Sequence, residues 1–132
     1  MVDALSIALS GLMAQDQRLS VSANNIANAD TTGALPTPQA PASTVYKPLT
    51  VNFTSQPGGG VLSHVTSNPN GYTAVPDLNG PYANSQGLVA APNVDLTQEM
   101  VNLLQAELLY KANIDVIKTQ KHMMGDLLNM IS

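Results

Sequence analysis

Proline is confined to the middle of this 132-residue chain, and that distribution limits the fold more than any other feature. All nine prolines and seven of the nine glycines fall between residues 29 and 94. Proline fixes φ and lacks a backbone N–H group, so a long helix is excluded from this stretch. The flanks contain no proline. We therefore expect a mainly α protein in which two long amphipathic terminal helices, within residues 1–29 and 95–132, form one discontinuous helical part around an irregular middle at 30–94.

Both flanks carry apolar residues at alternating steps of three and four, the 3.5-residue repeat of a coiled-coil helix face. In the first flank seven of eight repeat positions are apolar, and they read Val2, Leu5, Leu9, Leu12, Asp16, Leu19, Ala23 and Ile26. In the second flank nine of eleven are apolar, and they read Leu96, Met100, Leu103, Glu107, Tyr110, Ile114, Ile117, Lys121, Met124, Leu128 and Ile131. Charges at such positions either select a partner or lie at the edge of the stripe in solvent, and the repeat leaves both interpretations open.

The second helix is long for a chain of this size, because at about 1.5 Å per residue it extends roughly 54 Å. Asp95 is a suitable N-cap, with Gln98 three residues later as in a capping box. Further apolar residues widen the stripe beyond a two-helix seam, and these are Val101, Leu104, Leu108, Leu109, Val116, Met123 and Leu127. The shorter first helix covers only part of this stripe, which predicts that other chains cover the rest.

Small residues in the first helix, Ala4, Ala8 and Gly11, lie on nearly one face and would let another backbone approach closely. Glycine inside a helix costs about 0.8–1 kcal/mol relative to alanine, so Gly11 is expected to have a packing reason. The run from Asn24 through Asn28 is interpreted as a C-terminal cap and turn, because Asn tolerates the left-handed conformation that ends many helices.

The middle segment predicts one small β-hairpin. Alternating residues between Val45 and Phe53 precede a Gly-rich turn at 56–60, and a second strand-like run follows at 61–66. Pro48 inside the first run limits it to an edge strand. Four of the five aromatic residues lie in this middle, which indicates anchoring against the helices or a neighbouring subunit.

Composition and motifs argue against several functions. The net charge of −4 leaves no basic surface for nucleic acid, and the absence of cysteine removes disulfides and thiolate sites. His64 and His122 are far apart without clustered carboxylates, and Gly58–Gly60 lacks the Lys of a phosphate-binding loop. We expect no catalytic residue, no cofactor and no metal site. No run approaches the ~18 apolar residues of a membrane span, and the N-terminus lacks a basic region typical of a cleaved signal peptide.

The run Ser22-Ala-Asn-Asn-Ile-Ala-Asn-Ala-Asp-Thr-Thr-Gly33, after an amphipathic helix, resembles the N-terminal signature of the bacterial flagellar rod and hook proteins. The C-terminal flank is similar to the last helix of the proximal-rod members. The matching residues there are Pro92–Asp95, Glu99–Asn102, Ala106, Tyr110, Ala112–Ile114, Val116, Thr119, Lys121 and Met123–Met124. The chain length also fits these members, because distal-rod and hook relatives carry large inserted domains between the two helices.

The resemblance implies that the terminal helices pair as a coiled-coil-like unit, and that copies stack helically into the periplasmic rod that transmits motor torque. It implies as partners other copies of the chain, proximal- and distal-rod proteins, a rod-base adaptor, and the flagellar type III export apparatus, which exports such subunits without a cleaved signal. Taken with the repeat, it predicts subunit-interface residues at Leu5, Leu9, Leu12, Leu19, Asn25, Ile26, Asn28, Met100, Leu103, Tyr110, Ile114, Ile117, Lys121, Met124 and Leu128. Lys121 or Arg18 would pair with an acidic residue of an adjacent subunit.

Two other classes of function use the same helices. A soluble adaptor or export chaperone would hold one partner helix in a small closed complex rather than in a helical polymer. An amphipathic membrane-surface protein would need a basic polar face, and the first helix offers only Arg18 as a cation. The rod subunit is the interpretation that accounts for both flanks together.

Overall fold

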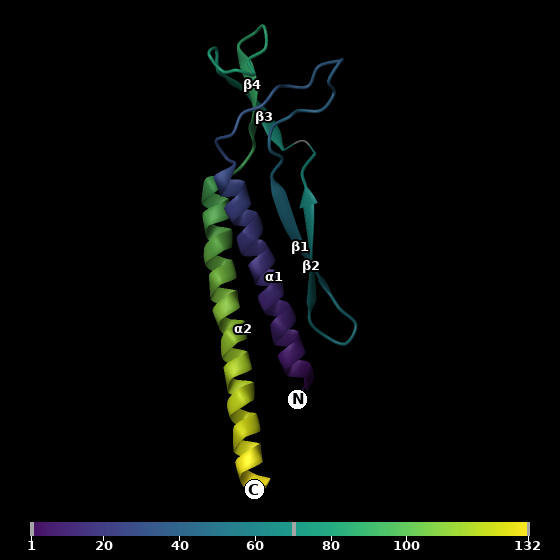
Figure 1. Ribbon diagram of the computed structural model, residues 1–132, viewed down its shortest axis with the longest axis vertical. Coiled ribbons are helices and arrows are strands. Elements are labelled where there is room, and N and C mark those ends of the chain that lie inside the picture. Colours follow the sequence, from purple (N-terminus) through teal and green to yellow (C-terminus); the bar gives the residue numbers. More distant parts are fainter. Residues whose placement is uncertain (1, 70, 132) are drawn as a thin grey trace. The chain divides into compact units, whose positions relative to one another are not determined.

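The computed structural model describes residues 2–69 and 71–131 and contains two helices and four strands in the order α1, β1, β2, β3, β4, α2. Helix α1 spans Val2–Ala27 and helix α2 spans Leu96–Ile131 (Figure 1). The two predicted terminal helices are therefore confirmed. The outermost residues of the predicted helical part, 1 and 132, and the side chain of Val2 lie outside the described part of the chain.

Four strands form two separate two-stranded antiparallel sheets, β1 with β2 and β3 with β4. The predicted hairpin is present, with β1 at Leu49–Ser55 and β2 at Val61–Ser67. Strand β1 begins directly after Pro48, because proline cannot donate a backbone hydrogen bond. The turn closes through Gln56 N–H to the Gly60 carbonyl at 3.1 Å, and all three glycines at 58–60 have φ between 91° and 95°, which other residues rarely adopt.

The sequence predicts one hairpin, but the structure contains a second pair of strands. Strand β3, Tyr72–Pro76, pairs with β4, Leu88–Pro92, in the register Ala74 opposite Ala90. Both strands are short, both end in proline, and eleven residues separate them in place of a two-residue turn, so the sequence lacks the usual hairpin signals. Gly33 extends this sheet by one residue through two 2.9 Å bonds with Ala90.

The ends of the helices explain why each starts or stops where it does. The Asp95 carboxylate accepts a bond from the Gln98 N–H at 3.1 Å, so the predicted N-cap of α2 is confirmed. At the end of α1 the side-chain amide of Asn28 donates to the Asn24 carbonyl at 2.9 Å. The turn predicted after α1 is present, because the Ala29 N–H donates to the Ile26 carbonyl and the Thr31 N–H to the Asn28 carbonyl, both at 3.2 Å. The left-handed conformation expected there is absent, since among the described residues a positive φ occurs only at Gly58, Gly59, Gly60 and Gly87.

The chain divides into two compact units that cut across both helices and the hairpin, a division different from the sequence-based one at 30–94. The first unit comprises Met1–Ser20, Val51–Val65 and Val101–Ser132, and the second comprises Val21–Thr50 and Thr66–Met100. In the first unit the fully buried apolar residues are small, namely Ala8, Ala14 and Ala106. In the second unit Val21, Val45, Val89 and Ala90 are buried. Among the residues whose burial the structure describes, apolar side chains larger than alanine are therefore buried in the second unit alone.

Candidate functional site

Exposed apolar side chains dominate α2 in the first unit. Ala106 is the one buried residue among those of α2 that the structure describes, although half of the helix consists of apolar residues. Leu104 and Leu108 are each 68% exposed, and a run of half-exposed or exposed apolar residues continues through Val101, Leu109, Val116, Met123, Met124, Leu127, Leu128, Met130 and Ile131. A single soluble chain does not normally leave this many large apolar side chains in water, so the helix has the character of an incomplete interface.

The predicted interface residues fall into three groups. The exposed ones are Leu5, Leu9, Met100, Lys121, Met124 and Leu128. The partly buried ones are Leu12, Leu19, Ile26, Asn28, Leu103, Tyr110, Ile114 and Ile117. Asn25 alone is fully buried, at 1% exposure. Its side-chain amide makes its hydrogen bonds inside the chain.

Helices α1 and α2 approach closely in the first unit at Gly11. A methyl group built on Gly11 would lie 2.8 Å from the Asn113 side-chain oxygen, which is closer than side chains tolerate. The Asn113 amide nitrogen in turn donates to the Leu109 carbonyl at 2.9 Å, which holds the side chain in place. The expectation of a packing reason for Gly11 is therefore confirmed. Figure 1 shows α1 and α2 running next to each other in opposite directions.

The tip of the β1–β2 hairpin is docked on α1 in the same unit. The Ser10 hydroxyl donates to the Ile7 carbonyl at 2.7 Å and accepts from the Val61 N–H at 3.1 Å, so one side chain links helix and hairpin. The Ile7 side chain reaches to 2.8 Å from where a Cβ on Gly59 would lie. Further along α1, the Arg18 guanidinium lies 5.0 Å from the centre of the Phe53 ring, within cation–π range. Arg18 thus has a partner within the chain.

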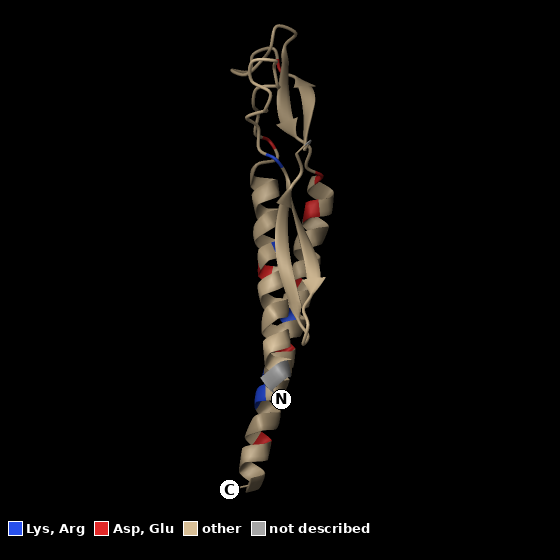
Figure 2. Cartoon of the chain, turned by 90° about the vertical axis from the view of Figure 1, so that its right-hand side faces the viewer, with Lys and Arg blue, Asp and Glu red and all other residues tan. Residues whose placement is uncertain are grey.

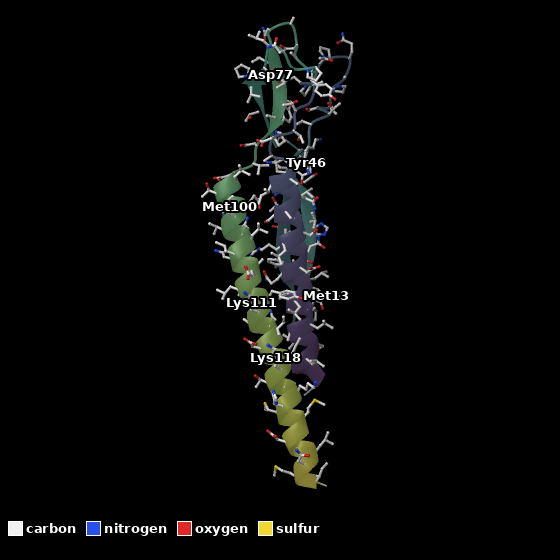
Figure 3. The ribbon with its side chains drawn as sticks, turned by 60° about the vertical axis from the view of Figure 1, so that its left-hand side comes forward. Met13, Tyr46, Asp77, Met100, Lys111 and Lys118 are labelled. Atoms are coloured by element: carbon white, nitrogen blue, oxygen red, sulfur yellow. The ribbon has the colours of Figure 1, made fainter. Side chains whose placement is uncertain are left out.

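Charges are sparse along both helices (Figure 2). Glu107 accepts a bond from Lys111, and Asp115 from Lys118, and all four side chains are more than half exposed. The hydrogen bond from Lys111, followed by its charge, lowers the pKa of Glu107 below its usual value. In the single chain Glu107 is therefore exposed and paired within its own helix. Lys111 and Lys118 are labelled in Figure 3.

A polar cluster centred on Asn25 holds the second unit together. The Asn25 side-chain oxygen accepts from the Leu49 N–H and from the Tyr46 hydroxyl, both at 2.9 Å. Its nitrogen donates to the Leu49 carbonyl at 2.9 Å and to the Glu99 carboxylate at 2.6 Å. Both donors and both acceptor positions of the amide are therefore used. Burial, and then the charge of Glu99, raise the pKa of Tyr46, whose position is labelled in Figure 3.

The sequence interpretation missed this cluster because it treated Asn25 as part of a cap. A usable signal exists in the helix spacing. Ala14, Val21 and Asn25 follow one another at steps of seven and four, which places them on one face of α1. Ala14 and Val21 are apolar and buried, so an Asn continuing that face indicates a buried polar group that needs partners.

No group of three or more His, Cys, Asp or Glu side chains with metal-binding geometry occurs within residues 2–69 and 71–131. In the same described residues, neither helix is apolar enough over its length to cross a membrane. The surface that remains as a candidate for function is the exposed apolar face of α1 and α2.

Two family models match the chain, one at each end. "Flagella basal body rod protein" matches residues 5–34, and "Flagellar basal body rod FlgEFG protein C-terminal" matches residues 85–130. These ranges include the Asn-rich run at the end of α1 and nearly all of α2. The segment between them contains the β1–β2 hairpin.

Whole-length relatives agree with both matches. The flagellar basal-body rod protein FlgC of Yersinia enterocolitica is 39% identical over 130 residues, covering 94% of this chain and 92% of the relative. The protein of the same name from Salmonella typhimurium is 37% identical over the same shares. The one from Bacillus subtilis is 32% identical over 91% of each chain. The chain belongs to the FlgC family of flagellar basal-body rod proteins.

Proposed function

We propose that this chain, a structural subunit of the flagellar basal-body rod, forms the proximal rod by packing helically with further copies and with related rod proteins, so that the polymer transmits motor torque. The observation that carries the proposal is the exposed apolar face of α2 in the first unit, where Leu104 and Leu108 are each 68% exposed. Burying apolar surface stabilises association by about 25 cal/mol per Å². A helical polymer with neighbours on several sides offers the burial that one chain lacks.

The helical part would be the rod core, with residues 1–29 and 95–132 paired as a coiled-coil-like unit and residues 30–94 as an outer segment. Two observations support the pairing, which are the 3.5-residue apolar repeat of both helices and the close approach of Gly11 to Asn113. A continuous pair of long helices resists twisting better than a chain of flexible loops. This suits a part that carries torque.

The family also indicates where the subunit acts. Relatives are named as basal-body rod proteins, and this places the chain in the rod of the bacterial flagellum. We further propose a periplasmic position, and export by the flagellar export apparatus without a cleaved signal. Such export would make that apparatus a transient partner. An adaptor or export chaperone is disfavoured, because the relatives that cover most of the chain carry the names of rod proteins.

Replacement of Ile114 by Asp tests the proposal. Ile114 is partly buried on the repeat face of α2, and an unpaired charge at such a position costs about 3–5 kcal/mol when neighbours surround it. The variant is expected to be stable as a chain but absent from purified basal bodies, with loss of motility. His122→Asp, an equal charge introduced at an exposed position of the same helix, is the matched control and should retain motility. Normal incorporation of Ile114→Asp would contradict the proposed packing.

A further inference from the structure

An apolar groove with a volume of about 450 Å³ opens in the first unit, near the first turns of α1. Its walls come almost entirely from α2, with one residue from α1, and the lining residues are Leu5, Ile117, Gln120, Lys121, Met124, Gly125 and Leu128. A Cβ on Gly125 would meet no atom within 4 Å, so this wall has room for an arriving side chain. The groove is therefore shaped for an apolar helix face rather than closed by its own chain.

Lys121 is the single charge in the lining of this groove. It forms no ion pair with any side chain in residues 2–69 and 71–131 that the structure describes. Beside it, the Gln120 side-chain nitrogen is buried and has no hydrogen-bond partner among those residues. A buried donor without a partner costs about 1–3 kcal/mol. Both groups are donors, so an occupant of the groove should bring an acceptor with negative charge.

The exposed face of α1 has the complementary character. Leu9 is 51% exposed and Met13, which is labelled in Figure 3, is 66% exposed. Asp16 lies on the same face, is exposed, and has no ion-pair partner within the described part of the chain. Apart from Asp16, the charged side chain that the structure describes on α1 is Arg18, which lies over Phe53. The face is thus an apolar stripe with one acid.

Asp16 cannot reach Lys121 of its own chain. The two helices run in opposite directions and Gly11 lies opposite Asn113, so Asp16 lies near the level of residue 108. Lys121 is thirteen residues further along α2, or roughly 20 Å at 1.5 Å per residue. An Asp16–Lys121 pair therefore requires two chains shifted along the helix direction by about this distance.

We propose that the groove receives α1 of a second copy of this chain, with Asp16 of one copy paired to Lys121 of the other. Because the two helices run in opposite directions, each residue toward the start of α1 is matched by one toward the end of α2. With Asp16 level with Lys121, Met13 is level with Met124, and Leu12 is level with Gly125, where there is room for a side chain. Leu9 then lies level with Leu128. The contact rests on the proposed rod function, since it describes how neighbouring rod subunits meet. Of the two cations considered from the sequence, Lys121 rather than Arg18 makes the intersubunit pair.

Disulfide trapping tests this contact directly, because the chain contains no cysteine. Full-length Asp16→Cys and Lys121→Cys chains are mixed, oxidised and analysed on non-reducing gels. The mixture should give a covalent dimer at several times the yield of a control mixture of Asp16→Cys with Asp115→Cys, in which the second cysteine lies on the exposed side of α2. Equal yields in the two mixtures would overturn the proposal.

Charge reversal gives an independent measurement. Asp16→Lys and Lys121→Asp should each weaken self-association in sedimentation velocity by about tenfold, and the double variant should recover most of the loss. Lys118→Asp, at a solvent-exposed pair of the same helix, controls for net charge. Circular dichroism verifies that each variant keeps its helix content. A double variant no better than the singles would rule out the pair, whereas failure of the Ile114→Asp test would instead remove the proposed rod packing.

Discussion

Removal of the Asn25 amide should destabilise the second unit far more than removal of any exposed Asn. In Asn25→Ala four hydrogen bonds disappear together, two of which join Asn25 to the N–H and the carbonyl of Leu49. Asn25 is 1% exposed, but its partners are partly buried and some can turn toward water. At about 0.5–1.5 kcal/mol for each bond, reduced by that rehydration, the expected loss is about 2–4 kcal/mol.

Asn25→Asp separates hydrogen bonding from packing, because the two side chains have nearly the same shape. The carboxylate keeps the bonds from the Leu49 N–H and the Tyr46 hydroxyl but places an oxygen against the Leu49 carbonyl and the Glu99 carboxylate. The introduced carboxyl should have a raised pKa in the folded chain, because it is buried beside a like charge. Its protonated form can donate again. The destabilisation should therefore be largest at neutral pH and decrease as the pH falls through that raised pKa.

Equilibrium unfolding in urea and hydrogen exchange at the Leu49 amide measure these effects. The Leu49 N–H donates directly to Asn25, so its exchange reports on the cluster itself. Asn28→Ala is the matched control, because the Asn28 amide makes an exposed bond at the end of α1, and a loss of no more than about 0.5 kcal/mol is expected. If Asn25→Ala changed neither stability nor Leu49 exchange more than Asn28→Ala, the assigned role of the cluster would be wrong.

Three further predictions concern other positions. Burial and the charge of Glu99 raise the pKa of Tyr46. The contribution of the neutral Tyr46 hydroxyl to stability is therefore complete below pH 10 and is lost as the pH rises through the raised pKa. Tyr46→Phe should reduce this alkaline loss of stability, measured by urea unfolding over a series of pH values. Gly33→Ala places a Cβ 2.6 Å from the Val45 backbone nitrogen and should lower stability by about 2–3 kcal/mol, whereas an unchanged thermal midpoint would show that this loop moves freely. Gly11→Ala should not stabilise the chain by itself, because the new methyl group meets the Asn113 side chain. In an Asn113→Ala chain the same change should stabilise by about 1 kcal/mol, since the obstructing side chain is gone and alanine favours helix. An equal effect in both backgrounds would contradict the close approach of the two helices.

Local patterns made the two helices and the first hairpin predictable. The absence of proline, the 3.5-residue repeat and the cap at Asp95 all act within a few residues of one another. The Gly-rich turn at 58–60 is local in the same sense, because positive φ values favour glycine. The excess of apolar residues on α2 likewise follows from counting, and it predicts partners for this helix from the sequence alone.

Contacts between distant residues were decided by the tertiary structure alone. Asn25 forms hydrogen bonds with Leu49, 24 positions away, and with Glu99, 74 positions away. The local sequence around Asn25 predicts neither partner. The β3–β4 pair and the Gly33–Ala90 bridge depend on the path of the chain between them. The same holds for Arg18, which the sequence allowed as an intersubunit cation and the structure places over Phe53. Periodicity determines which face of a helix is apolar, because side-chain direction follows from backbone geometry, but which segment covers that face depends on how the whole chain packs.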